Sequence, residues 1–539
     1  MSKSTIEKSP YVLHPFFLGA FPVVFLFSEN YNFVPASQVI LPLIVIEIFV
    51  VLFYLGLNLF FNNPLKTGLI LSPLIFFFFS FGHFHLLYEL SRGSLVSSQL
   101  KYLILVLLII SFCAFLYGIK YFLSSGSGLR GITDFLNVVS IALVTISTFS
   151  LGLTSMTSSS PKVEDVQNRP LQVKKTEKEL PDIYFFLLDS YARKDVLKEL
   201  YGYDNSAFLR YLKEKGFFVA ARSRSNYPYT LATLSSLFNL KYHKFGPEFK
   251  NLTMLDNRIF TRQIWNNRVL PILKKLGYTT ITFDSGSGIN EQLVNSDIVF
   301  ATSAWDLNDF QTMLINTTFL PYLTVALYKI SKDYFIRDIY YSRRRKFKNM
   351  YKKMQQIIEE KYLKFVFVHI LQPHEPFLFN ADGSDNSPPP GVNGVIWFIP
   401  FKGRDKESYI KGYTQQLTFI NNKVKTLIEQ IFKSSGGKAL ILIQSDHGPA
   451  LNLEPYSIEK TDLRERLCNL MAFYFPDREM YKYLSQDITP INTFPLIFNL
   501  FFGIKINLFK NRSFFSSIDQ FYQFTDVTAR LDKLQNNRK

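Results

Sequence analysis

Two predicted strands in this chain run into acidic residues, the residue type that metal-dependent chemistry requires. The apolar run 183–188 leads into Asp189, and a later apolar run leads into residues 445–448, Ser-Asp-His-Gly, which contain Asp446 and His447. A neighbouring carboxylate and imidazole followed by glycine allow a tight turn to direct both side chains at one metal ion. A single carboxylate at the end of a strand can instead cap the next helix, and for Asp189 taken alone this alternative stays open.

The candidate nucleophile is Thr230, which follows the stretch Ser-Asn-Tyr-Pro-Tyr and precedes a predicted helix over 230–239. At the start of a helix, free backbone N–H groups and the helix dipole favour an incoming phosphate. A divalent ion bound nearby would lower the pKa of the threonine hydroxyl enough for attack at neutral pH. The structural alternative is that Thr230 only caps the helix, and the local sequence does not decide between the two.

Two histidines lie at the end of a third apolar run, 365–371. His369 falls inside the run, where a hydrogen-bonded core histidine and a functional histidine are equally good interpretations. His374 follows the run and is flanked by Pro373 and Pro376, which restrict the backbone around it. Its imidazole could supply a proton to a leaving group.

The elements that must position these residues alternate in type from residue 181 onwards. Short apolar runs predict strands, and longer stretches with helical periodicity predict helices such as 230–239, 346–361 and 409–432. This alternation is typical of an α/β domain with a largely parallel central sheet, in which ligands bind beyond the carboxyl ends of the strands. The predicted strands are 183–188, 217–221, 279–283, 365–371, 439–443 and 470–475.

The first 155 residues differ in composition from the rest and predict an N-terminal bundle of five transmembrane helices. Each of five apolar runs is close to the ~20 residues that span a bilayer. Basic residues near the ends of the runs favour a cytoplasmic N-terminus, so that an odd number of spans places the remainder outside the cytoplasm. The predicted spans are 11–28, 37–61, 67–87, 102–122 and 132–151.

Composition limits the function classes further. The 539 residues are 47% hydrophobic and carry a formal net charge of +17. This charge is compatible with nucleic acid, an anionic membrane surface or an anionic substrate, and the apolar runs favour the last two over nucleic acid. The two cysteines lie in different kinds of segment, so they indicate neither a disulfide framework nor a cysteine-based zinc site.

The predicted organisation is a transmembrane domain over residues 1–155, a polar linker over 156–180 and an extracytoplasmic catalytic domain over 181–539. The linker is rich in serine and charged residues and shows no apolar periodicity. Within the catalytic domain, the basic run 343–346 (Arg-Arg-Arg-Lys) either lies against anionic headgroups or forms a solvated helix face.

Taken together, these motifs resemble the alkaline phosphatase and sulfatase superfamily. The shared order is an aspartate after the first strand, a threonine or serine at a helix start, and Ser-Asp-His-Gly late in the chain. The stretches PDIYFFLLDSYAR, GFFVAARSRSNYPYT and SDHGP are similar to bacterial membrane proteins described as sulfatase-like hydrolases or transferases. Five spans followed by such a domain look like the lipoteichoic acid synthase and phosphoethanolamine transferase branch.

The resemblance implies roles for individual residues. Asp189, Asp446 and His447 would be metal ligands, and Thr230 would be both nucleophile and fourth ligand. His374 would contact the substrate or the leaving group. The transferase branch usually has glutamate where this chain has Asp189, and no histidine follows His447, so that one divalent ion (Mn, Zn or Mg) is expected instead of two.

The implied activity is transfer of a phospholipid headgroup phosphate, of the phosphoglycerol or phosphoethanolamine type, to an envelope glycan through a phospho-threonine. The protein would be a multi-pass protein of the cell membrane, with a phospholipid donor and a glycan acceptor as partners. The motif that sulfatases convert to formylglycine is missing around Thr230, which argues against hydrolysis of sulfate esters. A phosphodiesterase or phosphatase that uses the same site, and a catalytically silent membrane sensor or scaffold, are the alternatives.

Overall fold

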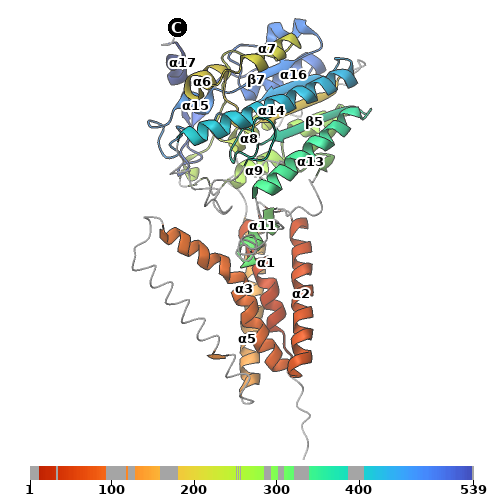
Figure 1. Ribbon diagram of the computed structural model, residues 1–539, viewed down its shortest axis with the longest axis vertical. Helices are drawn as coiled ribbons and strands as arrows, with labels where there is room; N and C mark the ends of the chain where they lie inside the picture. The colour runs from red at the N-terminus through yellow and green to blue at the C-terminus, as the bar shows by residue number, and fades with distance from the viewer. Residues whose placement is uncertain are drawn as a thin grey trace, which may run out of the picture. The chain divides into compact units, whose positions relative to one another are not determined.

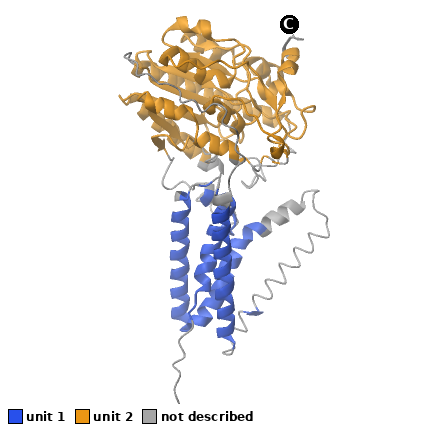
Figure 2. Ribbon diagram, turned by 180° about the vertical axis from the view of Figure 1, so that it is seen from behind, with its two compact units in different colours: residues 1–159, 307–337 blue, residues 160–306, 338–539 orange. Residues whose placement is uncertain are grey.

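The computed structural model forms two compact units (Figure 2). Unit 1 comprises residues 1–159 and 307–337, and unit 2 comprises residues 160–306 and 338–539. The structure describes residues 11–31, 34, 36–92, 117–118, 128–157, 180–250, 252, 254, 257–284, 293–300, 309–320, 339–386 and 406–536. Most of the predicted linker 156–180 therefore lies outside the described residues.

Unit 1 is built from apolar helices. Its described helices are α1 (His14–Asn30), α2 (Ser37–Phe61), α3 (Pro64–Arg92), α5 (Leu129–Thr157) and α11 (Asp309–Asn316). Along α2, large apolar side chains point away from the protein, and an outward apolar surface of this kind suits contact with lipid.

Three of the five predicted spans coincide with helices that are long and apolar enough to cross a membrane. These helices cover Gln38–Phe61, Pro64–His83 and Leu129–Leu153. The predicted first span coincides with α1, which has only 17 residues and contains Pro22. The predicted fourth span, 102–122, lies almost entirely outside the described residues. The described part of the chain therefore supports three spans, and the count of five stays a prediction.

Helix α11 belongs with unit 1 although it follows four strands of the sheet in sequence. Phe310 is fully buried, and its ring lies edge-on to that of Phe27 with 6.5 Å between ring centroids. Beyond the helix, the carbonyl of Thr317 accepts a hydrogen bond of 2.8 Å from the backbone N–H of Gly82 in α3. The segment is thus packed into the helical unit, which sequence periodicity did not indicate.

Unit 2 contains a seven-stranded sheet in the order β2-β7-β6-β1-β5-β3-β4. Strands β6, β1, β5, β3 and β4 are parallel to one another. At one edge β7 pairs antiparallel with β6, and β2 pairs antiparallel with β7. The prediction of a largely parallel sheet is therefore confirmed. The strands are β1 (Ile183–Leu188), β2 (Phe218–Val219), β3 (Thr279–Phe283), β4 (Ile298–Phe300), β5 (Lys364–Ile370), β6 (Leu440–Gln444) and β7 (Met471–Tyr474).

Helices cover both faces of this sheet (Figure 1). One face packs against α6 (Lys194–Tyr201), α7 (Ser206–Glu214), α13 (Ile339–Glu359) and α14 (Lys406–Ser435). The opposite face packs against α8 (Thr230–Asn239), α9 (Arg258–Trp265), α10 (Val269–Lys275) and α16 (Thr493–Phe502). The central strand β1 is buried along its whole length and contributes alternate side chains to the two cores, as expected for a parallel strand covered on both sides.

The remaining elements of unit 2 are short. A two-stranded sheet pairs β8 with β9 in antiparallel orientation. These elements are η1 (Pro247–Phe249), α15 (Leu463–Leu467), η4 (Arg478–Tyr483), η5 (Pro490–Asn492), β8 (Phe514–Phe515), β9 (Thr525–Asp526) and α17 (Thr528–Asn536).

Candidate metal centre

The sheet places Asp189 and His369 side by side. Strands β1 and β5 are parallel neighbours, and Leu187 lies opposite His369 in their register. Successive side chains of a strand point to opposite faces. Leu187 and Phe367 belong to the core on the α8 side, so His369 and Asp189, each two residues further along, lie toward that same side. The register thus brings an imidazole and a carboxylate to one point at the end of the sheet.

Asp446 and His447 reach this point from β6, the other neighbour of β1. The backbone N–H of Ser190 lies 3.3 Å from Asp446 Oδ1, and Ser190 adopts a left-handed φ of 61° that turns the chain back toward β6. Gly448 allows the backbone after His447 to pass close to the backbone of Glu465, because a Cβ atom at position 448 would lie 1.8 Å from the carbonyl oxygen of Glu465. The glycine of the Ser-Asp-His-Gly motif therefore has a packing role.

Thr230 is the first residue of α8. Its side chain does not cap the helix, since Tyr229 occupies the N-cap position and no side-chain cap is formed there. Instead, Thr230 Oγ1 lies 3.1 Å from His447 Nε2. The structure therefore replaces the capping interpretation of Thr230 with a contact to the histidine of the metal motif.

The loops that carry Thr230 and Asp446 are held together by buried polar contacts. Arg466 donates hydrogen bonds of 2.7 Å to the carbonyls of Pro228 and Gly448, one on each loop. Ser225 Oγ and Thr233 Oγ1 both donate to the backbone carbonyl of Asp446. These contacts fix the distance between the hydroxyl and the acid in the way that a preorganised site requires.

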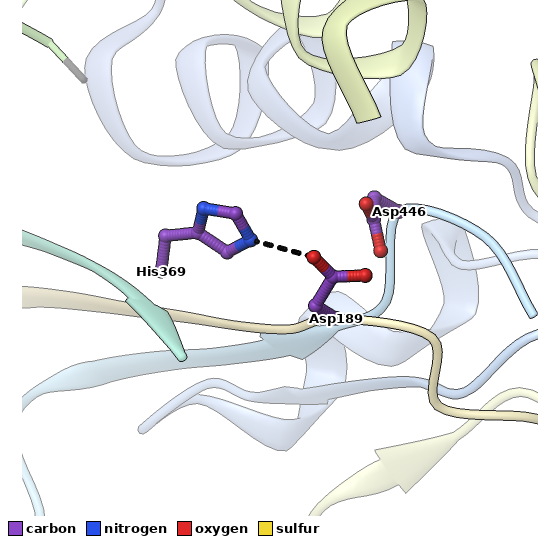
Figure 3. A group of neighbouring side chains, drawn as sticks. All are labelled: Asp189, His369 and Asp446. Atoms are coloured by element: carbon purple, nitrogen blue, oxygen red, sulfur yellow. Dashed lines mark ion pairs between the residues drawn. The ribbon is translucent and has the colours of Figure 1, made fainter. Parts of the chain in front are cut away.

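Three buried side chains form a group that could hold a metal ion (Figure 3). One potential ligand atom each from Asp189, His369 and Asp446 lies within 4.8 Å of the others. His369 Nε2 is 3.3 Å from Asp189 Oδ2. His447 Nε2 is 3.3 Å from Asp446 Oδ2 and 3.8 Å from Asp189 Oδ1. All the predicted ligands therefore converge, and His369 joins them.

The two carboxylates influence each other's ionisation. Burial, together with the negative charge of Asp189, raises the pKa of Asp446. Burial alone would also raise the pKa of Asp189, but the imidazoles of His374, His369 and His447 outweigh it and hold that pKa well below its ordinary value. One of the two acids thus ionises easily and the other resists ionisation, which is the expected behaviour of a close pair of carboxylates.

His447 is held as a neutral imidazole. Burial, reinforced by the positive charge of Arg466, lowers the pKa of His447 well below its usual range. Its Nδ1 lies 2.9 Å from the carbonyl oxygen of Gly448, which can only accept, so Nδ1 carries the proton. The lone pair of Nε2 is then directed toward Thr230 and the two acids, and this is the tautomer and charge state that a metal ligand needs.

The donor set fits a divalent cation. Two buried carboxylates with ligand atoms no more than 4.8 Å apart repel each other, and a cation between them would remove that repulsion. Two carboxylates with one or two imidazoles are ligands that zinc, manganese and related ions accept. The ligand set alone does not choose among these metals.

His374 lies at the edge of this group. Its backbone N–H donates to the carbonyl of Asp189 at 3.2 Å, and Gln416 donates to the carbonyl of His374 at 2.8 Å. The imidazole is half-buried, with its ring centroid 6.2 Å from that of His447. The half-buried side chain of His374 therefore lies close to the candidate ligands, but it is not part of the group formed by Asp189, His369 and Asp446.

Sequence reasoning left His369 undecided and did not consider Ser190 or Arg466. His369 sits in an apolar run that looks like any buried strand, and only its parity with Phe367 and Phe365 indicates that it points toward the α8 face. Ser190 Oγ lies 3.1 Å from Asp189 Oδ1 and 3.2 Å from His447 Nδ1. Arg466 is in a helix of five residues, where the sequence carries no sign of its two loop contacts.

Comparison with known proteins places this arrangement in a family. The family model described as Sulfatase matches residues 181–504. A search of curated proteins finds no match. Among solved structures, the C-terminal periplasmic domain of EcEptC from Escherichia coli is similar at 13% identity, with a TM-score of 0.42 and coverage of 66% of this chain and 96% of that chain.

Two further solved structures are similar at comparable levels. The integral membrane protein lipooligosaccharide phosphoethanolamine transferase A from Neisseria meningitidis is 11% identical, with a TM-score of 0.38 and coverage of 91% of this chain and 96% of that chain. A protein in the alkaline phosphatase superfamily from Vibrio parahaemolyticus is 10% identical, with a TM-score of 0.38 and coverage of 64% and 74%. Because the family match covers more than half of the chain, the protein belongs to the sulfatase family and is a sulfatase-like hydrolase or transferase.

Proposed function

We propose that the protein is a membrane-anchored, metal-dependent phosphotransferase that moves a phospholipid headgroup phosphate to an envelope glycan through a phospho-threonine at Thr230. One observation carries this proposal. Thr230 Oγ1 lies 3.1 Å from His447 Nε2, beside the buried pair Asp189 and Asp446. A hydroxyl at the start of a helix and next to a metal ligand is positioned as an activated nucleophile.

Asp189, Asp446, His447 and Thr230 would hold one divalent ion, with His369 within reach of the same position. When bound, such an ion lowers the pKa of the Thr230 hydroxyl and neutralises charge on a phosphoryl oxygen. Thr230 is also the first residue of α8, and the free backbone N–H groups at the start of a helix favour an anionic group. The proposed ligand set shares Asp189 and Asp446 with the group found by proximity alone, and it has His447 and Thr230 where that group has His369.

The reaction would proceed in two displacements. The Thr230 hydroxyl first loses its proton to solvent. Its Oγ1 then forms a bond to phosphorus while the bond from phosphorus to the lipid oxygen breaks, and the His374 imidazolium gives its proton to that leaving oxygen. In the second step a glycan hydroxyl forms a bond to phosphorus, the bond to Thr230 Oγ1 breaks so that Thr230 leaves as the alkoxide, and His374 takes the proton of the hydroxyl. The half-buried position of His374 next to His447 supports this role, because exchange of lipid and glycan requires access from solvent.

Two features of the chain favour a phospholipid as the donor. The helices α2, α3 and α5 each contain a stretch able to span a bilayer, and a donor embedded in lipid has to be met at the membrane. The residues around Thr230, Tyr-Pro-Tyr-Thr-Leu-Ala-Thr over 227–233, offer no cysteine or serine for conversion to formylglycine. A phosphoryl group therefore suits the site better than a sulfuryl group, despite the family description.

The proposal also requires the catalytic unit to lie outside the cytoplasm. The basic residues near the predicted helix ends, Lys3, Lys8, Lys66, Lys120 and Arg130, lie predominantly on one side, which the positive-inside rule assigns to the cytoplasm. A reporter enzyme that works only outside the cytoplasm, fused after the last residue, is expected to be active. Activity only of a cytoplasmic reporter at this position would contradict the envelope assignment.

The test of the chemistry is the covalent intermediate. The full chain, purified in nanodiscs and loaded with Mn, Zn or Mg in turn, is incubated with phospholipids that carry a labelled headgroup phosphate, and intact-mass and peptide mass spectrometry then locate the label. We expect label on Thr230 in the wild type and in the Thr230→Ser variant, which keeps a hydroxyl. The Thr230→Val variant has nearly the same volume without the hydroxyl, so it is expected to lose label and transfer together.

Addition of an envelope glycan fraction then separates transferase from hydrolase. Label that moves from Thr230 to the glycan supports the transferase. Label that appears only in water-soluble products at every glycan concentration would instead assign phosphodiesterase activity to the same site. Wild type that stays unlabelled with every metal and phospholipid, although it binds metal, would favour a silent sensor or scaffold.

A further inference from the structure

The loop that carries His374 is held by α14, a helix on the face of the sheet opposite to α8. Phe377 and Leu378 of this loop belong to the same core as α14, whereas α8, which begins with Thr230, belongs to the core on the other face. The proposed nucleophile and the proposed acid therefore depend on different helices for their positions.

Gln416 of α14 bonds to this loop at two places. Its Nε2 donates a hydrogen bond of 2.8 Å to the carbonyl oxygen of His374, and its Oε1 accepts one of 2.6 Å from the backbone N–H of Leu378. The side chain is fully buried, and a buried amide is costly unless it is hydrogen-bonded. One contact needs a donor and the other an acceptor, so an amide suits this position and a carboxylate or a hydrocarbon does not.

Apolar packing next to Gln416 keeps the second half of the loop close to α14. Phe377 is buried, and its ring lies edge-on to that of Tyr409 with 5.2 Å between ring centroids. Gly412 makes room for Phe377, because a Cβ atom at position 412 would lie 2.3 Å from the ring. Gln416 extends this attachment from the packed end of the loop to His374 itself.

The backbone of His374 is fixed on both sides. Its N–H donates to the carbonyl of Asp189 at 3.2 Å, and its carbonyl accepts from Gln416. Its Nδ1 lies 2.5 Å from the carbonyl oxygen of Glu375, which can only accept, so Nδ1 carries a proton and Nε2 is the nitrogen left to exchange one. The two backbone bonds hold His374 where its ring centroid is 6.2 Å from that of His447.

We propose that Gln416 is a positioning residue for His374, which it holds beside the candidate metal centre so that Nε2 gives its proton to the leaving oxygen. Gln416 bonds to backbone groups of the loop and acts through His374. The inference rests on the role that the proposed function gives to His374. A displacement of about 1 Å at a reacting group costs about 100-fold in rate, so loss of the Gln416 bonds should slow proton transfer while the domain stays folded.

The first measurement needs no turnover. The full chain in nanodiscs, loaded with metal, is treated with diethyl pyrocarbonate, and peptide mass spectrometry gives the rate at which each histidine is modified. In Gln416→Met, which keeps the length of the side chain without its hydrogen bonds, His374 should react about 5-fold faster or more. His369 and His447 are buried and should stay protected, which shows that the fold is intact. A His374 rate that does not exceed that of the wild type would overturn the proposal.

Gln415→Met is the matched control, because it makes the same chemical change one residue away. Gln415 Oε1 accepts a hydrogen bond of 2.8 Å from the N–H of Ala381, which lies seven residues after His374. This variant should leave the modification of His374 at the wild-type rate. A rise as large as that in Gln416→Met would show that any loosening at α14 exposes the loop, and it would remove the special assignment of Gln416.

The second measurement tests whether this position serves proton transfer. The proteins are given phosphoethanolamine esters of glycerol and of 4-nitrophenol, which carry the same phosphoryl group, and formation of phospho-Thr230 is timed by intact mass. Glycerol needs a proton to leave, whereas 4-nitrophenolate does not. Gln416→Met should slow the glycerol ester about 10- to 100-fold and the nitrophenyl ester about 3-fold or less. In a His374→Gln background Gln416→Met should cause no further loss, as expected of a residue that acts through His374.

The two measurements separate this inference from the proposed function. If His374 reacts faster in Gln416→Met but neither ester phosphorylates Thr230 in the wild type, Gln416 positions His374 and the proposed transfer fails. If the wild type forms phospho-Thr230 and Gln416→Met slows both esters alike, the transfer stands and the link between Gln416 and proton transfer is overturned.

Discussion

Replacing Asp446 with asparagine should make the metal-free protein more stable and at the same time remove its response to metal. Asp446 and Asp189 are both buried, and their ligand atoms lie no more than 4.8 Å apart. Asparagine can keep the contact of its side-chain oxygen with the N–H of Ser190. Its amide NH₂ can then occupy the place of Asp446 Oδ2, 3.3 Å from the lone pair of His447 Nε2. A repulsive contact is thereby exchanged for a hydrogen bond.

The size of the effect follows from the separation of the charges. Two unit charges 4.8 Å apart repel by about 3 kcal/mol at an effective dielectric constant of about 20. In the wild type, proton uptake by Asp446 already relieves part of this repulsion. The free energy of unfolding of the metal-free Asp446→Asn variant should therefore exceed that of the wild type by about 1 to 3 kcal/mol. At about 2 °C per kcal/mol for a domain of this size, the Tm should rise by about 2 to 6 °C. Metal at 100 times its Kd should stabilise the wild type by about 2.7 kcal/mol and the variant by almost nothing.

The assay is thermal unfolding of unit 2 within the full chain, followed by intrinsic fluorescence at a fixed heating rate with and without Mn, Zn or Mg. Asp519→Asn is the matched control, because Asp519 is exposed and the same chemical change there should shift neither the Tm nor the metal response. A metal-free Asp446→Asn protein that melts below the wild type would refute the argument from repulsion. Equal stabilisation of both proteins by metal would refute Asp446 as a ligand.

Three further substitutions test the site and its support. His369→Ala should weaken metal binding about 10- to 100-fold in a metal titration, if His369 takes part in holding the ion; unchanged affinity would return it to the role of a core histidine. Gly448→Ala should cost about 1 to 3 kcal/mol or more in thermal unfolding and reduce metal affinity, because the new Cβ would lie 1.8 Å from the carbonyl of Glu465. Lys364→Met should destabilise unit 2 by about 1 to 3 kcal/mol in urea unfolding, since Lys364 is buried and bonded to the partly exposed Asp182 at 2.7 Å; a stability equal to that of the wild type would show that this pair contributes nothing.

The sequence predicted the elements of unit 2 where local pattern and tertiary packing agree. The run 183–188 is apolar throughout and forms a strand buried on both faces, and 230–239 has helical periodicity and forms α8 with the predicted bounds. The strand β4 was not predicted, because it has three residues and no periodicity can be read from so few. The two-residue strand β2 lies inside the predicted strand 217–221. The first apolar run does form a helix, α1, but with 17 residues and Pro22 inside it this helix is shorter than the three that are long enough to cross a membrane, so the first span stays a prediction.

The basic run at 343–346 shows what local sequence cannot reveal. Its composition suits an exposed helix face, and the structure buries Arg343 and Lys346 instead. The carboxylate that pairs with Lys346 is Asp284, which follows β3 and is far away in the sequence. Burial of a charge depends on such distant partners, and periodicity carries no information about them.

The face of the sheet to which His369 points follows from the sequence once the run 365–371 is taken as a strand. Within a strand, parity alone divides side chains between the two faces. In β1 the odd-numbered residues Phe185 and Leu187 face α8, the helix that begins with Thr230, and Asp189 continues that series. The same alternation applies to the parallel neighbour β5. Phe367 of β5 belongs to the core on the α8 side, so His369, two residues later, points to the side on which Thr230 lies. Parity does not determine the register of β5 against β1. If β5 were shifted by two residues, His369 would still point to the same face of the sheet, but its imidazole would lie roughly 6.6 Å further along the strand, beyond the reach of Asp189. The pairing of β5 with β1, which depends on the whole sheet, is therefore what brings the imidazole of His369 next to Asp189.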